Sequence, residues 1–599
     1  MKRVLSIILF FVFALSSLLS CGQTKEPIES NSEASGGEST DTDQTQSSTP
    51  TPDTINCNHN VVKTVNGKEP TCIETGLTDG KKCATCGKIL EKRQIIPTIS
   101  HIYVNNYCKM CGIEYVPTLE ELINGNEKVD TKQVILNDWE GKTLNVLATN
   151  WYGAKGMVNG WSEPDLTVNG YDNDGTSVWG TTINNAILKR KEFVKETYGV
   201  ELKFIVSYKE ATMSNQLFEA NKPEAIEKYH IAMPRIFEAQ QLVQNQVVYD
   251  LSNSNFIDFS KPYYNQIAHE AFTVAGHTFF AAGDFSFLDE LTSYVIYYNM
   301  AISDNVENFP DLYQTVKEGK WTISEMAKWA ATVIDDNGAN AGIWEDDDTY
   351  GFGATSLTHF FQTSGITQIG VNNSSSNPSD YQYKLSLNED PSLIEQLVNQ
   401  LSTLLDNENS WSRTNWMGSS RAMEESFTNG KLLFYNEIMK NIYKLPAQSE
   451  SFKLGVLPMP KLNESESYYT PCANQSTVMC IPKCTPDRNM SEYFLDVLSH
   501  TGQDYVMKAY YSDLKTRIYQ GTEEGRTPND SIEIIKNYIL NNIMYDLGYI
   551  NNTLTFVQND TIADILNADA FSESYNEYVG YALETVSKWN NWYDAYKEQ

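Results

Sequence analysis

Two periodicities of hydrophobic and polar positions follow one another between residues 143 and 233. Residues 143–149 (TLNVLAT) form a compact apolar run, and apolar and polar residues alternate over 201–208; both patterns predict β-strands. Apolar residues recur at helical spacing over 182–198, residues 213–221 also predict a helix, and 231–233 is a short apolar strand. The order strand–helix–strand–helix–strand predicts a parallel, doubly wound sheet covered on both faces, and therefore an α/β fold.

The first twenty residues carry the pattern of a cleaved secretory signal. Lys2 and Arg3 form a basic front, and residues 4–19 are apolar and uncharged, as in a signal peptide. The stretch ends in L-L-S-C at Cys21, which resembles the lipobox of bacterial lipoproteins, whose cysteine is lipidated after cleavage. We therefore expect a signal peptide at 1–20 and lipidation at Cys21. A plain signal peptide or a membrane-spanning helix is the alternative interpretation.

The segment that follows predicts a tether. Residues 21–56 are rich in Ser, Thr, Glu, Asp, Gln, Gly and Pro and contain no aromatic residue. Such a segment buries too little apolar surface to offset its ordering entropy, so we expect it to be disordered. No later segment has the length and apolarity of a transmembrane helix. The sequence thus predicts a protein anchored through its lipid to the extracellular face of the cell membrane.

The overall composition limits the classes of partner. The chain has 599 residues, of which 41% are hydrophobic and 12% aromatic, enough for several domains with full cores. Its formal net charge is −32. A surface this acidic repels phosphate backbones, so we expect no nucleic-acid partner, and it opposes lying flat on an anionic membrane. We expect the chain to be a monomer.

A small cysteine-rich module is predicted at residues 57–115. It contains two C-x-x-C-G units, whose tight turns direct both thiolates of a pair toward one ion. Eight soft or borderline ligands suit one or two tetrahedral zinc sites of structural type. They are Cys57, His59, Cys72, Cys83, Cys86, His101, Cys108 and Cys111.

The division of these ligands between two sites is open at the level of sequence. One plausible set is His59, Cys72, Cys83 and Cys86, with His101, Cys108, Cys111 and Cys57 left for the second. A disulfide framework, which an extracellular location permits, is the competing interpretation, although it does not explain why histidines recur beside the cysteines. The runs PTCIETGLTDGKKCATCG and IPTISHIYVNNYCKMCG resemble small zinc-ribbon-like repeats on surface proteins of anaerobic bacteria.

A succession of short motifs follows in the remaining chain. They are VVYDLSNS (247–254), VAGHTFFAAGD (274–284), VIYYNMAI (295–302), LYQTVKEGKWTISEMAKWA (312–330), SFTNGKLLFYNE (426–437) and GVLPMPK (455–461). In this order they resemble the motifs of family 1 extracellular solute-binding proteins, the sugar receptors of ABC importers. The resemblance runs from residue 142 to the end, and it depends on the order because each motif is weak by itself.

The resemblance implies a periplasmic-binding-protein-like fold of two α/β lobes with the ligand between them. The chain would cross between the lobes near 292–297 and again near 469–479. Residues 116–141 are expected to be a connector, helical over 119–123 and 128–138. The solute-binding domain would cover 142–599, with lobe one at about 142–291 and 480–525 and lobe two at about 298–468 and 526–599.

Candidate ligand contacts follow from the predicted sheet and from the resemblance. Open α/β sheets bind ligands beyond the carboxyl ends of their strands, and the first strand is followed by Trp151 and Tyr152. Sugars stack their apolar faces on aromatic rings, and their hydroxyls need polar partners. The positions that the resemblance places at the cleft are Asp284, Phe285, Trp416, Tyr435, Asn436 and Glu437.

Three functions compete at this stage. The resemblance implies a lipid-anchored receptor that binds a carbohydrate and delivers it to the ABC permease subunits without bond chemistry. The length and aromatic content of the chain favour an oligosaccharide as the carbohydrate. A surface glycan adhesin or sensor is the alternative, favoured by the cysteine-rich module. An extracellular carbohydrate-active enzyme is less favoured, because the chain has no G-x-S-x-G motif and no phosphate loop, although paired glycosidase carboxylates need no local motif. Cys472, Cys480 and Cys484 lie near the second crossing, where two of them can pair.

Overall fold

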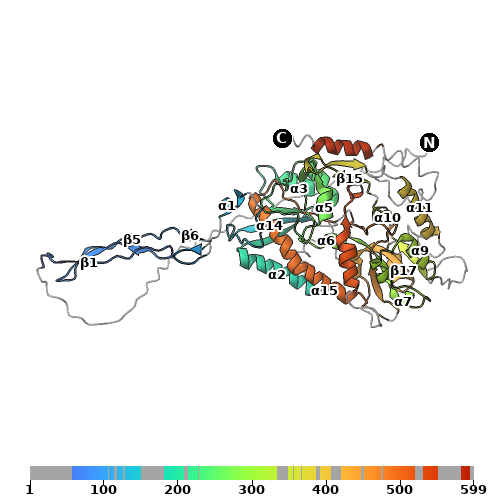
Figure 1. Ribbon diagram of the computed structural model, residues 1–599, viewed down its shortest axis with the longest axis horizontal. Helices are drawn as coiled ribbons and strands as arrows, with labels where there is room; N and C mark the ends of the chain where they lie inside the picture. Colours follow the sequence, from blue (N-terminus) through green and yellow to red (C-terminus); the bar gives the residue numbers. More distant parts are fainter. Residues whose placement is uncertain are drawn as a thin grey trace, which may run out of the picture. The chain divides into compact units, whose positions relative to one another are not determined.

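The computed structural model divides the chain into two compact units, Met1–Val116 and Pro117–Gln599 (Figure 1). The signal peptide, Cys21 and the tether lie outside the described residues. No helix among the residues that the structure describes is long and apolar enough to cross a membrane. The described residues are 57–104, 107–113, 118–125, 128–149, 181–207, 213–226, 228–333, 348–354, 357–365, 367–385, 391–406, 420–446, 449, 451–473, 476–519, 530–550, 580 and 582–593.

The first unit is a succession of short antiparallel strand pairs. β1 (Val62–Val65), β3 (Gly80–Cys83) and β4 (Ile89–Glu91) form a three-stranded sheet in the order β1-β3-β4. β2 (Gly76–Leu77) pairs with β5 (Ile95–Ile96), and β6 (Tyr103–Val104) pairs with β7 (Tyr107–Cys108). Hydrophobic burial does not hold this unit together, because its buried residues among those described are three cysteines and two glycines: Cys72, Gly76, Gly80, Cys83 and Cys108.

Lobe one of the second unit is built on a parallel three-stranded sheet in the order β10-β8-β9. Val146 of the central strand pairs with Ile231 on one side and Phe204 on the other. Because parallel strands need crossover connections, a helix separates each pair along the chain. The elements are β8 (Thr143–Thr149), α2 (Thr181–Tyr198), β9 (Glu201–Ser207), α3 (Met213–Ala220) and β10 (Ile231–Met233).

The later helices of lobe one come from a distant part of the sequence. α14 (Arg488–Thr501) continues through the π-helical turn η4 (Gly502–Met507) into α15 (Lys508–Arg517). Tyr493 and Phe494 of α14 pack edge-on against Tyr198 of α2, with ring centroids 5.9 and 5.4 Å away. This aromatic contact joins residues about 300 positions apart into one hydrophobic core.

Lobe two is built on a mixed four-stranded sheet in the order β14-β17-β13-β18, and its elements gather opposite α2 and α14 in Figure 1. β13 runs antiparallel to both neighbours, and β14 runs parallel to β17. Thr322 caps α9, its hydroxyl oxygen accepting from the Glu325 amide at 3.2 Å. The elements are β13 (Tyr294–Asn299), α7 (Met300–Ser303), α8 (Leu312–Lys317), α9 (Ile323–Ala330), β14 (Tyr350–Ala354), α10 (Thr358–Thr363), α11 (Pro391–Asp406), α13 (Ser420–Thr428), β17 (Leu432–Ile438) and β18 (Leu454–Leu457).

Three short segments lie side by side where the two lobes join, and we call them the junction. Ser293 pairs with Cys472, and the Ala473 amide donates to the Thr292 carbonyl at 3.0 Å. β19 (Thr470–Pro471) pairs in parallel with β20 (Ile543–Met544). The two segments that the sequence predicts as crossings are thus adjacent, and β20 is a third junction strand that the sequence did not predict.

The structure confirms the two-lobed α/β class and corrects one predicted helix. Residues 119–123 are helical as expected, as α1 (Leu119–Ile123), but residues 128–138 form turns. This segment packs on lobe one: Val129 and Leu136 are buried, and the Trp139 indole donates to the Asp487 carboxylate at 2.9 Å. The apolar side chains of this segment are therefore buried by packing on lobe one, without the helix that their spacing predicted.

Candidate functional site

A cavity of about 290 Å³ opens next to the junction. Its wall combines elements from distant parts of the chain: the loop before α5 (Gln266–Phe272), the short helix α6 (Leu288–Leu291), α15, and the turn η6 (Leu540–Asn542) before β20. Three aromatic and three acidic side chains lie on this wall. They are Tyr263, Tyr264, Tyr511, Asp284, Asp289 and Glu290.

A buried carboxylate fixes the two consecutive tyrosines of the cavity. The Tyr264 hydroxyl donates to Asp496 Oδ1 at 2.7 Å, and the Tyr263 hydroxyl donates to Asp496 Oδ2 at 3.1 Å. Thr131 Oγ1 donates to the same Oδ2 at 2.6 Å. Both tyrosines line the cavity, although their side chains are only 2 and 3% exposed. Their rings pack against each other with centroids 5.0 Å apart, and an aromatic surface of this kind suits an apolar ligand face.

The three cavity carboxylates differ in how well the protein satisfies them. Asp284 Oδ2 accepts from Gln503 Nε2 at 2.9 Å, and Asp289 Oδ2 accepts from the Tyr545 hydroxyl at 3.2 Å. Glu290 is 5% exposed, and its Oε2 has no hydrogen-bond partner among the described residues. Asp289 and Glu290 lie between Leu288 and Leu291 in α6. All four residues of this short helix are buried.

Burial and mutual repulsion favour the protonated forms of these acids. Loss of solvation, followed by repulsion from Asp289, raises the pKa of Asp284 to about 7. Burial also raises the pKa of Asp289, and burial together with Asp289 raises the pKa of Glu290 well above its ordinary value. A cluster of carboxyl groups with raised pKa values in a cavity is a typical mark of a functional site.

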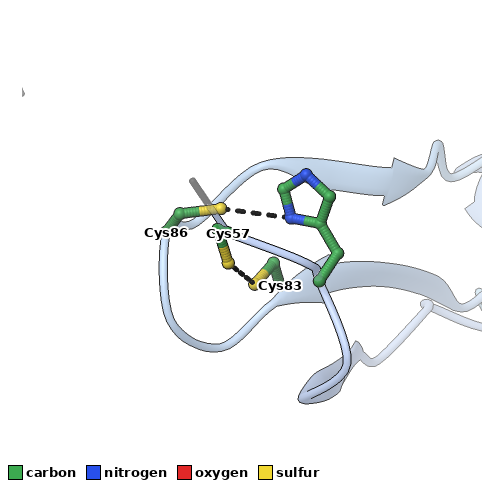
Figure 2. A group of neighbouring side chains, drawn as sticks. Cys57, Cys83 and Cys86 are labelled. Carbon is green, nitrogen blue, oxygen red and sulfur yellow. Dashed lines mark hydrogen bonds between the residues drawn. The ribbon is translucent and has the colours of Figure 1, made fainter. Parts of the chain in front are cut away.

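Two clusters of cysteine and histidine form a second candidate site, in the first unit. Figure 2 shows the first cluster, in which Cys57 Sγ lies 3.4 Å from Cys83 Sγ, and Cys86 Sγ lies 3.4 Å from the imidazole Nδ1 of His59. All four ligand atoms lie within 4.8 Å of one another. This cluster can hold a metal ion.

The second cluster repeats this geometry with different residues. Cys72 Sγ lies 3.7 Å from Cys108 Sγ, and Cys111 Sγ lies 3.4 Å from His101 Nδ1. Its four ligand atoms also lie within 4.8 Å of one another. The first unit therefore contains two equivalent positions for a metal ion.

Each C-x-x-C-G unit closes as the same turn. The Gly87 amide donates to the Cys83 carbonyl at 3.0 Å, and the Gly112 amide donates to the Cys108 carbonyl at 2.9 Å. The two glycines have φ of 75° and 73°, a conformation that favours glycine. The His59 ring, then the Cys86 and Thr85 amides, lower the pKa of Cys83 to about 5. The turn thus favours a thiolate, the form that binds metals.

Comparison with known proteins gives matches of structure only. No model of a known protein family matches this chain, and no curated protein matches it. The chain is similar to MalX from Streptococcus pneumoniae in complex with maltopentaose, at 15% identity and a TM-score of 0.42 over 74% of this chain and 100% of that chain. It is similar to a sugar transporter protein from Rhizobium etli in an open conformation (13%, TM-score 0.47, 74% and 98%). It is also similar to an extracellular solute-binding protein from Staphylococcus aureus in complex with maltose (13%, TM-score 0.45, 74% and 98%).

The predicted ligand contacts are divided among the cavity, the core, the sheet of lobe two and segments outside the described residues. Asp284 lines the cavity. Phe285 is fully buried, and its carbonyl accepts from Arg190 Nη1 at 2.6 Å. Trp151, Tyr152 and Trp416 lie outside the described residues.

The three predicted contacts on β17 lie within the sheet of lobe two. Tyr435 and Asn436 are fully buried, and Nδ2 of the Asn436 side chain donates to the Val295 carbonyl at 3.1 Å. Glu437 is partly buried, and its Oε1 accepts from the amide of the next residue at 2.9 Å. These side chains take part in packing β17 against β13, and the cavity is lined by other residues.

Most of the cavity residues were not predictable from the sequence. The sequence did offer one signal for a polar site: two acids lie inside the apolar run FSFLDEL (285–291). Acids within an apolar run are buried with it unless the segment lies at the surface. Tyr263, Tyr264 and Tyr511 had no such signal, since they come from separate segments that only the tertiary fold brings together.

The structure also corrects the proposed division of metal ligands. Cys57, not Cys72, joins His59, Cys83 and Cys86. The reason is strand pairing: β1 pairs with β3 with Val62 opposite Cys83, which brings the segment before β1 to that cysteine. All nine described cysteines are free thiols, including Cys472, Cys480 and Cys484, so the pairing considered near the second crossing is not formed.

Proposed function

We propose that the second unit is the solute receptor of an ABC importer and binds a carbohydrate in the cavity next to the junction. The observation that carries the proposal is the cavity itself, in which stacking rings and hydrogen-bonding carboxylates line one space beside the junction. This combination suits a sugar, whose apolar faces and hydroxyls need both partners. The order of the six motifs between residues 247 and 461 supports the same family. Cys21 would supply the lipid anchor at the extracellular face of the membrane.

The proposed mechanism uses binding and closure without bond chemistry. The rings of Tyr263 and Tyr264 hold the apolar face of the sugar, and Asp284 accepts hydrogen bonds from its hydroxyls. Contacts from both sides of the junction favour the closed arrangement, so binding shifts the population toward it. Permease subunits would then recognise the closed form.

A melting screen with soluble saccharides tests this proposal. We expect at least one saccharide to raise the melting temperature in proportion to its concentration and to be recovered unchanged. Trp151→Ala should weaken that binding, whereas Phe218→Ala, which removes an exposed aromatic side chain on α3, should not. Release of a cleaved product would favour the enzyme hypothesis, and no stabilisation by any saccharide would refute the receptor.

A glycan adhesin or sensor is the second candidate, and the first unit is the observation that favours it. Twelve of the sixteen exposed large apolar side chains among the described residues belong to this unit. An importer receptor does not need such a surface, whereas a protein that docks on another does. Saccharide uptake by cells that lack the chain distinguishes the two functions: uptake is lost for an importer receptor and unchanged for an adhesin or sensor.

We further infer that each cysteine–histidine cluster holds one zinc ion in a structural role. Two thiolates at about 2.3 Å from a tetrahedral ion lie about 3.8 Å apart, and a thiolate and an imidazole nitrogen about 3.5 Å apart. The separations of 3.4 and 3.7 Å between sulfur atoms and of 3.4 Å between sulfur and nitrogen fit these values. Because the unit buries little besides cysteine and glycine, the ions would supply its stability.

Metal analysis of paired variants tests both zinc and the ligand sets. The wild type should bind two ions per chain, and Cys57→Ser combined with His59→Ala should bind one, because both residues belong to one cluster. Cys57→Ser combined with Cys72→Ser should weaken both sites. Cys484→Ala, in the second unit, is the control and should bind two. Absence of zinc from protein purified without chelator, or loss of both ions in the first double variant, would contradict the assignment.

A further inference from the structure

The cavity next to the junction is strongly unbalanced in charge. Three carboxyl groups line it, and none of the described residues that line it is a lysine, arginine or histidine. The two nearby lysines have other partners: Lys132 Nζ lies 3.6 Å from Asp504, and Lys536 Nζ lies 4.0 Å from the centre of the Tyr511 ring. Lys132 thus acts on Asp284 only from outside the lining, and no basic side chain among the described lining residues pairs with the three carboxyl groups.

Glu290 is the acid of this wall that the protein satisfies least. Its side chain is buried at 5% exposure and lines the cavity, yet its Oε2 has no hydrogen-bond partner among the described residues. The same unit satisfies Asp496, which is equally buried, with three hydroxyl donors. A buried acceptor without a donor destabilises a protein, so the missing donor at Glu290 is best supplied by what enters the cavity.

A single metal ion does not fit this wall. Among the described residues, the groups of three or more acidic, histidine or cysteine ligands whose atoms lie within 4.8 Å of one another are the two cysteine–histidine clusters. The three cavity carboxylates are too far apart to form such a group. A ligand of molecular size can reach all three, and tyrosine rings on the same wall favour an organic cation.

We propose that the saccharide bound in this cavity carries a protonated amine, so that the receptor is selective for an amino sugar. This inference rests on the proposed carbohydrate receptor and names its substrate class. The ammonium group supplies three N–H donors and lies beside Glu290 and Asp289, while the sugar ring lies against Tyr263 and Tyr264. The cavity volume of about 290 Å³ is at the lower end for small-molecule sites, so one sugar ring occupies it.

Calorimetry with matched sugars tests the amine. Each set contains an amino sugar, its N-acetyl derivative and the parent sugar with a hydroxyl at that position: glucosamine, N-acetylglucosamine and glucose; galactosamine, N-acetylgalactosamine and galactose; and the corresponding disaccharides. In at least one set the amine should bind about tenfold or more tightly than both neutral members at pH 7, because a close buried charge pair is worth at least this factor. High salt should reduce the preference.

Two variants locate the preference in the cavity. Glu290→Gln prevents ionisation of the unsatisfied carboxyl group with little change of shape and should reduce the amine preference to about threefold or less. Glu270→Gln removes the same charge from an exposed position on α5 and should retain the preference. Circular dichroism of both variants shows whether they are folded.

The outcomes separate this inference from the receptor proposal. Neutral sugars that bind as tightly as their amines would overturn the amine and leave the carbohydrate receptor intact. An amine preference unchanged in Glu290→Gln would overturn the placement beside Glu290. Binding of no member of any set would count against both proposals.

Discussion

Neutralising one cavity acid should stabilise the folded protein, and the gain should grow with pH. The substitution is Asp284→Asn, which keeps the shape of the side chain and an oxygen that can accept from Gln503 Nε2. Burial and repulsion from Asp289 raise the pKa of Asp284 from 3.8 to about 7, and Asp504 adds to this effect. Gln503 and Lys132 act in the opposite direction and lower this pKa. The ionised form is thus disfavoured in the folded chain.

The sign and size of the effect follow from this shift of pKa. The unfolded chain releases the Asp284 proton near pH 4, whereas the folded chain holds it to about pH 7. The contribution of Asp284 to stability is therefore highest below pH 4, falls as pH rises to about 7, and is constant above that. Between pH 5 and pH 8 the loss is about 2.5 kcal/mol at about 1.4 kcal/mol per pH unit. Because Asp284 is partly exposed, solvent screening reduces the expected loss to about 1 kcal/mol.

Thermal unfolding of wild type and variant at pH 5 and pH 8 measures this effect. For a unit of this size about 1 kcal/mol corresponds to about 1 °C, so the variant's gain in melting temperature should be about 1 °C larger at pH 8. Other titrating groups, such as His500, whose pKa burial lowers to about 4, cancel because both proteins contain them. Glu270→Gln is the control for net charge. A gain of equal size at both pH values, or a loss at pH 8, would refute this account of Asp284.

Two further substitutions test packing within the lobes. Gly455→Ala places a Cβ 2.0 Å from Cε1 of Tyr298 in the sheet of lobe two, and it should destabilise the protein by about 1–3 kcal/mol; unchanged urea unfolding would contradict this packing. Asp496→Asn replaces one of the two oxygens that accept from three hydroxyl groups with an NH2 donor. It should destabilise by about 1–3 kcal/mol and also weaken saccharide binding, because two of those hydroxyl groups belong to the cavity tyrosines. Retained affinity in calorimetry would show that the tyrosine rings do not contact the ligand.

Local sequence pattern was sufficient for the regular elements of lobe one. The strands at Thr143–Thr149 and Ile231–Met233 agree with the prediction at both ends, because short apolar runs bounded by polar residues leave little choice of register. The helix predicted at residues 128–138 was wrong for the opposite reason. This segment forms turns, and its apolar side chains are buried against lobe one. Periodicity describes which residues are buried, and it does not distinguish a helix from a packed irregular segment.

Pairing between distant segments was beyond the sequence. β20 is two residues long and pairs with β19 more than 70 positions away, so no local pattern identifies it. The metal ligands show the same limit: the cysteines and histidines were found by type and spacing, but the partner of each C-x-x-C unit depends on strand pairing. The Ile99 amide, for example, donates to the Thr71 carbonyl at 3.2 Å and thereby brings Cys72 close to His101.

The contrast between two buried acids connects the stability of this protein with its proposed function. Asp496 is 2% exposed and accepts from three hydroxyl groups, whereas Glu290 is 5% exposed and its Oε2 has no partner among the described residues. Neutralising Asp496 should destabilise the fold, because its two oxygens accept from three hydroxyl groups. If Glu290 serves a ligand, Glu290→Gln should stabilise the protein without ligand and at the same time weaken binding. The amide cannot ionise, so it removes both the cost of ionisation beside Asp289 and the charge that forms when an ammonium group binds. A residue that serves only packing would not produce both a gain in stability and a loss of binding affinity in one variant.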